Sequence, residues 1–188
     1  MAWKLKSANW CAFAMETDFI TAFGRLLRDG KLRDVFSADP RAAAAQIQLK
    51  QADLAAWSQL VPADVEFQAQ VLLRKRLDLV KYFAPETCRR PGDGLWPIFL
   101  KYARINWPPE GAARIVDAFQ FCRFLEDKKP GATEPSELNR LTFALGRSRL
   151  AVHWVNLPMK NGNPRRGFQI FLRVTGDQWR EFFLYVRL

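Results

Sequence analysis

The stretch LAVHWVNLPMKNGNPRRGFQIFLRVTGDQWREFFLYV, residues 150–186, decides the fold of this chain. Apolar side chains alternate with other side chains along three runs, at 150–154, 168–174 and 182–186. An alternation with a period of two is typical of β-strands. A polar segment at 160–164 and the tight-turn sequence Thr175-Gly176-Asp177 join the runs. The stretch therefore predicts a three-stranded antiparallel meander.

Before residue 147 the apolar residues recur at spacings of three and four, which is the period of an amphipathic helix. The longest helix is expected over 62–83, because Pro62 can open a helix and Pro85 stops it. We expect an α+β fold, with an N-terminal helical bundle followed by a C-terminal three-stranded antiparallel sheet. The domains are residues 1–146, a helical region with an N-terminal arm, and residues 147–188, the meander. The two should fold as one cooperative unit.

The composition excludes several kinds of site. Lys and Arg total 29 against 19 Asp and Glu, a net charge of +10 that favours an acidic partner. His153 is the single histidine, so several imidazole ligands cannot come from this chain alone. Three dispersed cysteines, without a CxxC pair, argue against a secreted disulfide scaffold. We expect a cytoplasmic protein, without a membrane span, that holds no cofactor of its own.

The candidate catalytic residues are weak. His153 has no nucleophile at a recognisable spacing, and the carboxylates are scattered, so no catalytic residue is predicted. Cys88 precedes Arg89 and Arg90, whose charges would lower the pKa of a nearby thiol. Residues 88–94 are expected to form a loop, because Pro91, Gly92 and Gly94 break helices. Two interpretations stay open for Cys88: a reactive thiol, or an ordinary surface cysteine in this basic loop.

The C-terminal stretch provides a better candidate for a binding surface. Residues 139–188 contain nine basic and two acidic residues, a net charge of +7. One strand face is expected to pack on the helices as core: Leu150, Val152, Trp154, Phe168, Ile170, Leu172, Leu184 and Val186. The other combines aromatic residues with Arg, as interface anchors do, and is the predicted peptide-binding surface: Arg149, His153, Phe171, Arg173, Trp179, Phe183, Tyr185 and Arg187. Alternatively, the N-terminal arm covers this second face.

A second group of basic and aromatic residues is predicted to contact a partner protein: Trp3, Trp10, Arg74, Arg76, Arg165 and Arg166. For Arg74-Lys75-Arg76 the alternative is a solvated helix face.

Four short stretches resemble a known family: FGRLLRDGKLRDVF at 23–36, DPRA at 39–42, LLRKR at 72–76 and LAVHW at 150–154. They resemble the small partner subunits of multinuclear non-heme iron-dependent oxidative enzymes. Those enzymes modify cysteines of ribosomally made peptides. The likeness is to the TglI type of 3-thiaglutamate biosynthesis and, more distantly, to the MbnC type of methanobactin biosynthesis. It implies a non-catalytic subunit in a heterodimer, with the iron in the partner enzyme and the precursor peptide on this chain. The resemblance also implies that the C-terminal sheet resembles a peptide-recognition element.

Two other functions stay open. A nucleic-acid-binding protein would use the same Arg and Lys residues on phosphates and the aromatic residues on bases, although no RNP-type motif, basic recognition helix or zinc knuckle is present. An independent hydrolase or thiol enzyme has the least support.

Overall fold

The computed structural model describes residues 16–108, 113–157, 165–175 and 178–186. The chain divides into two compact units, Met1–Gln70 and Val71–Leu188. This division falls inside a long helix, whereas the sequence placed its boundary at residue 146. Helices after residue 70 therefore belong to the same compact unit as the sheet. Cooperative folding of the whole chain stays a prediction.

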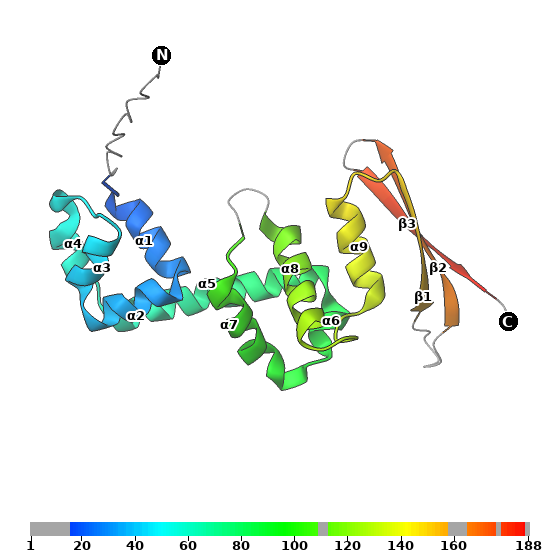
Figure 1. Ribbon diagram of the computed structural model, residues 1–188, viewed down its shortest axis with the longest axis horizontal. Helices are drawn as coiled ribbons and strands as arrows, with labels where there is room; N and C mark the ends of the chain where they lie inside the picture. Colours follow the sequence, from blue (N-terminus) through cyan, green and yellow to red (C-terminus); the bar gives the residue numbers. More distant parts are fainter. Residues whose placement is uncertain (1–15, 109–112, 158–164, 176–177, 187–188) are drawn as a thin grey trace, which may run out of the picture. The chain divides into compact units, whose positions relative to one another are not determined.

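The first unit is a series of short helices. Figure 1 shows them in succession: α1 (Phe19–Arg28), α2 (Gly30–Ala38), α3 (Pro40–Gln46), the 3-10 turn η1 (Gln51–Asp53), α4 (Leu54–Ser58) and the start of α5 (Pro62–Phe83). Asp18, Asp29 and Asp39 each cap a helix by accepting backbone N–H groups of its first turn. The buried Trp57 ring lies edge-on to the Phe36 ring, with the two ring centroids 5.3 Å apart. These aspartates explain why the chain can end one helix and begin the next within one or two residues.

The second unit contains helices followed by the sheet. Its elements are the remainder of α5, then α6 (Pro85–Arg89), the 3-10 turn η2 (Gly92–Gly94), α7 (Leu95–Ile105), α8 (Ala113–Lys128), α9 (Pro135–Leu145), β1 (Leu150–Leu157), β2 (Arg165–Thr175) and β3 (Gln178–Tyr185). Aromatic rings of α7 and α8 form its core, with Phe99, Tyr102 and Phe121 in mutual contact. The predicted α+β fold, helices first and an antiparallel sheet last, is confirmed.

Arg76 lies in this core, where it joins α5 to α8. Its guanidinium donates two hydrogen bonds of 2.6 Å to the buried carboxylate of Asp117 and one of 2.8 Å to the backbone oxygen of Asn106. The prediction that Arg76 contacts a partner was wrong, because this ion pair is buried. Arg74 is exposed and its guanidinium lies 5.0 Å from the centroid of the Trp96 ring.

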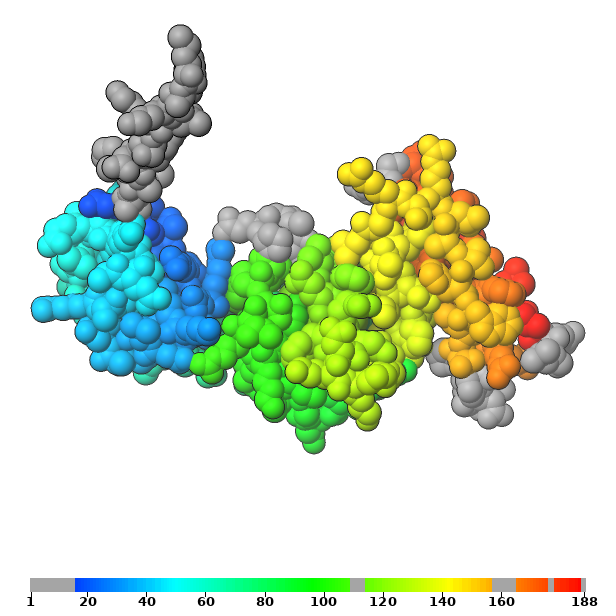
Figure 2. Space-filling model, viewed as in Figure 1, coloured from blue at the N-terminus to red at the C-terminus, as the bar shows by residue number. Residues whose placement is uncertain are grey.

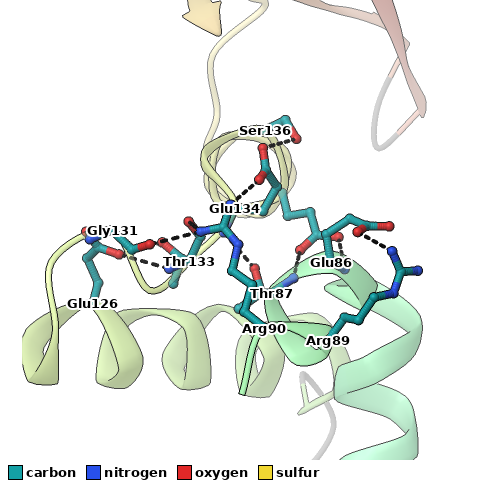
Figure 3. Close-up of polar contacts among 10 residues, drawn as sticks. Glu86, Thr87, Arg89, Arg90, Glu126, Gly131, Thr133, Glu134 and Ser136 are labelled. Carbon is teal, nitrogen blue, oxygen red and sulfur yellow. Dashed lines mark hydrogen bonds and ion pairs between the residues drawn. The ribbon is translucent and has the colours of Figure 1, made fainter. Parts of the chain in front are cut away.

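Residues 88–94, expected to be a loop, instead contain the end of α6 and the turn η2. Figure 3 shows the contacts that hold this region to the segment before α9. Arg90 donates to the backbone oxygens of Gly131 at 2.9 Å and Thr133 at 2.6 Å, and it pairs with Glu134. Glu137 accepts from the N–H groups of Glu86 and Thr87, both at 2.8 Å. A carboxylate from α9 therefore accepts hydrogen bonds from backbone N–H groups in the first turn of α6, which have no acceptor within that helix.

The sheet has the order β1-β2-β3, with both neighbouring pairs antiparallel. Leu150 pairs with Leu172, and Phe168 pairs with Leu184. The third strand begins at Gln178, earlier than the alternation at 182–186 indicated. Across the described ranges, no helix is both long enough and apolar enough to cross a membrane.

Candidate functional site

Helix α9 packs on the sheet face that carries Phe171. Phe143 of α9 stacks on Phe171 with ring centroids 5.0 Å apart, and Trp179 lies edge-on to both rings. Phe171 has no exposed surface. The sequence predicted a binding role for this face, so the assignment of the two faces was inverted. In Figure 2 the atoms of α9 and of the strands meet at the C-terminal end of the chain.

Polar groups of α9 explain the inversion. The side chain of Gln169, fully buried, donates to the backbone oxygen of Ser136 at 2.8 Å and to Glu181 at 2.7 Å. Arg140 of α9 makes two hydrogen bonds with Glu181, at 2.8 and 3.1 Å. Buried polar groups are tolerated where they find such partners. Gln169 and Glu181 therefore bind the helix and are not left for a ligand.

Arg173 also has a structural role. Its guanidinium donates to the backbone oxygens of Phe143 at 3.0 Å and Gly146 at 2.9 Å, and its Cζ lies 5.2 Å from the centroid of the Phe143 ring. These contacts fix the end of α9 where the chain turns into β1. Arg173 therefore links β2 to the C-terminal end of α9.

The opposite face of the sheet is uncovered in the described structure. Its large apolar side chains are each between 36% and 58% exposed, and we name them the open face: Leu150, Val152, Trp154, Phe168, Leu172, Val174, Phe182 and Leu184. Trp154 and Phe168 pack edge-on, with ring centroids 4.7 Å apart. Most of these residues were predicted to be core. Contiguous exposed apolar patches of this kind mark interaction sites in soluble proteins.

The charged side chains at the open face are basic. Residues on one face of a strand alternate, so Arg166 of β2 and Arg180 of β3 lie on the same face as Phe168 and Phe182. Both arginines are exposed, and the described part of this face holds no carboxylate. Glu181, the acidic residue within β3, lies on the α9 face. The open face is therefore apolar at its centre and positive at its ends.

Strands β1 and β3 form the two edges of the sheet. The backbone N–H of Arg173 donates to the backbone oxygen of Arg149 at 2.8 Å. This bond determines which β1 residues direct their backbone N–H and C=O groups toward β2. Because hydrogen-bonded pairs alternate in an antiparallel ladder, the backbone groups of Leu150, Val152 and Trp154 point away from β2. The side chains of the same three residues lie on the open face. Within the described ranges, the β1 edge thus combines backbone groups that no other strand pairs with and an apolar surface.

The other predicted site residues are scattered. Arg149 is exposed just before β1, and the half-buried ring of His153 lies 6.0 Å from Phe171 on the α9 face. Phe183 and Tyr185 also belong to the α9 face but remain 39% and 48% exposed. Arg165 and Arg166 are exposed at the start of β2. Three predicted residues lie outside the described residues: Trp3, Trp10 and Arg187.

The thiol chemistry considered from the sequence is disfavoured. Cys88 is buried, and burial, with a contribution from Glu137, raises the pKa of its thiol to about 12. Burial likewise raises the pKa of Cys122 to about 12. The arginines beside Cys88 point elsewhere, to Glu86 and to the segment before α9. Neither buried cysteine suits a nucleophilic role.

No group of three or more His, Cys, Asp or Glu side chains suited to a metal ion occurs in the described part of the chain. Comparisons with protein-family models, curated proteins and solved structures gave no match. The open face and the β1 edge are therefore the features from which we argue function.

Proposed function

We propose that this chain is a non-catalytic binding subunit that holds a ribosomal precursor peptide at the β1 edge. In this proposal it presents a cysteine of the peptide to an iron-dependent oxidative enzyme, its partner in a heterodimer, in a pathway of the 3-thiaglutamate type. The family resemblance supports the identity of the partner and the pathway. The geometry of β1 supports the peptide-binding role.

The β1 edge is the single observation that carries the proposal. An extended peptide beside β1 would form backbone hydrogen bonds with Leu150, Val152 and Trp154. Alternate side chains of that peptide would continue the open face, because neighbouring residues of paired strands share a face. Backbone bonds would supply affinity, while the apolar surface would select the peptide's residues. This is the mode of recognition by strand addition.

Charge favours β1 over β3 as the edge that takes an acidic peptide. Residues 146–157 include Arg147 and Arg149 but no acidic residue, and both arginines are exposed. In β3, Arg180 is accompanied by Glu181. An acidic leader would therefore be attracted to β1 and held in register there.

Holding the peptide is sufficient for an accessory role. When a reacting group is fixed beside a catalytic centre, an encounter between separate molecules becomes an effectively unimolecular step, worth about 7–11 kcal/mol in well-oriented cases. In this proposal the chain contributes backbone bonds, apolar contact and arginine charge. The iron chemistry belongs to the partner enzyme.

Amide hydrogen exchange tests where the peptide binds. Addition of the precursor peptide from a pathway of the 3-thiaglutamate type should slow hydrogen exchange at the N–H groups of Val152 and Trp154. Exchange in β3 should stay unchanged. Arg147→Glu with Arg149→Glu should weaken binding by about 1–3 kcal/mol, measured by titration calorimetry. Lys101→Glu with Lys129→Glu, two exposed lysines of the helical part, is the matched charge control. Protection at β3 alone, or equal weakening in both double variants, would refute peptide binding at β1.

The salt dependence of binding distinguishes the alternative function, nucleic-acid binding, from the proposed one. A protein that neutralises several phosphates loses affinity for nucleic acid steeply and linearly in log–log plots against salt. Copurification of an iron-containing protein at high salt supports the heterodimer. Copurification of nucleic acid, released as salt increases, supports the alternative.

A further inference from the structure

We propose that the open face binds an amphipathic helix of the partner protein, whose apolar stripe is flanked by carboxylates. The inference rests on the proposed function for the identity of the partner, and it adds a surface distinct from the β1 edge. Strand addition uses the backbone at one side of the sheet and leaves the open face itself uncovered. Eight large apolar side chains on that face remain half exposed without such a partner.

The dimensions of the sheet favour a helix as the occupant. Neighbouring strands are about 4.8 Å apart, so three strands present a surface about 10 Å across. That width matches an α-helix with its side chains, which is about 10–12 Å in diameter. On the opposite face, α9 already packs along the sheet through Phe143, Phe171 and Trp179. A second helix would complete a helix-sheet-helix arrangement of three layers.

The charges define the chemistry of that helix. Arg166 pairs with Asn156 near one end of the sheet, and Arg180 pairs with Leu172 near the other. Each arginine is exposed beside the apolar centre. A helix lying along the strands would therefore meet a positive charge near each of its ends. Carboxylates flanking its apolar stripe would pair with both arginines.

The same charges argue against two other occupants. A second copy of this chain would bring Arg166 and Arg180 to a face that offers no described carboxylate in return. Residues 1–15 contain Lys4 and Lys6 and no acidic residue. Like charges placed together disfavour both arrangements. A partner with acidic flanks is the occupant that complements this surface.

The test uses the full chain and a designed helical peptide of about 18 residues, long enough for five turns. The peptide has Leu at helical spacing with Glu on both flanks, and the matched peptide carries Lys in place of Glu. We expect the Glu peptide to bind about tenfold or more tightly than the Lys peptide in titration calorimetry. Arg166→Glu with Arg180→Glu should reverse that preference, whereas Lys101→Glu with Lys129→Glu should keep it.

A second variant separates lost binding from lost folding. Leu184→Lys places a charge on the open face at a side chain that is 57% exposed, so the fold should persist by circular dichroism while binding of the Glu peptide is lost. Equal affinity for both peptides, or no binding of either, overturns the inference. Two further results would overturn it. Concentration-dependent dimers that Leu184→Lys abolishes would show that a second copy of the chain covers the face. Binding of the helical peptide only after deletion of residues 1–15 would show that those residues cover it. Protection of β1 by the extended peptide is a separate readout, so either proposal can fail without the other.

Discussion

Arg76 and Asp117 form a buried ion pair in which Nε and Nη2 of the arginine each lie 2.6 Å from a carboxylate oxygen. Nη1 of Arg76 has no hydrogen-bond partner among the residues that the structure describes. The guanidinium also lies 4.8 Å from the centroid of Trp107 and 5.2 Å from that of Tyr102. Aromatic faces thus stabilise the part of the charge that the carboxylate does not reach.

Removing the carboxylate should destabilise the protein strongly. Asp117→Asn leaves the Arg76 charge buried without a counter-ion, and such a change costs about 3–5 kcal/mol. Asp78→Asn is the matched control, because Asp78 pairs with Lys81 at the surface and exposed pairs contribute about 0–1 kcal/mol. Urea unfolding of both variants measures the difference. A loss below 1 kcal/mol for Asp117→Asn would contradict the importance of this pair.

Stability should fall with rising pH above about 8.5, the usual pKa of a thiol in an unfolded chain. In the folded chain, burial raises the pKa of Cys88 and Cys122 to about 12. The unfolded state therefore releases these protons first, and the loss of stability per thiol rises toward a limit of about 1.4 kcal/mol per pH unit as the pH passes 8.5. Urea unfolding up to about pH 9.5, below the ordinary pKa of tyrosine, measures the slope. Cys88→Ala with Cys122→Ala should flatten it, and an unchanged slope would show that other groups are responsible.

Glu137 should be difficult to replace even by its amide. Its two oxygens accept from the N–H groups of Glu86 and Thr87, and Glu137→Gln would set a donor against one of these N–H groups. Leaving a buried donor unsatisfied costs about 1–3 kcal/mol. Glu86→Gln, which affects an exposed pair with Arg89, should change the free energy of unfolding by less than about 1 kcal/mol. Equal effects of the two substitutions would argue against this role for Glu137.

His153→Ala should retain most turnover at saturating peptide in the reconstituted complex, because the proposed role of this chain is to position the peptide. Deletion of residues 163–188 removes β2 and β3 and should abolish modification. Product formation is followed by mass spectrometry. A His153→Ala protein that binds enzyme and peptide normally but gives no product would show that the histidine takes part in the chemistry.

Expressed alone, the chain should contain no stoichiometric iron, because its nitrogen and sulfur side-chain ligands are one histidine and three dispersed cysteines. Elemental analysis measures the metal before and after coexpression with the iron enzyme. Iron is expected in the complex alone. Two or three iron atoms per isolated chain would overturn the assignment of the metal to the partner.

Local sequence signals predicted much of the secondary structure. Pro62 and Pro85 bracket α5, whose expected range of 62–83 is confirmed. Alternation located β1 and β2 because side-chain direction in a strand has a period of two residues. Residues 88 and 89 were assigned to a loop because Pro and Gly residues follow them, but they belong to α6, whose first turn is stabilised by Glu137, distant in sequence.

By itself the sequence determined the fold class, the positions of most helices and strands, and the sorting of side chains onto two faces of the sheet. Periodicity fixes which residues share a face, but it does not say which face a helix will cover. Only the tertiary structure decided that, because Arg140 and the backbone oxygen of Ser136 on α9 provide partners for Glu181 and Gln169. Long-range hydrogen bonds thereby buried the more polar face and left Trp154 and its apolar neighbours exposed.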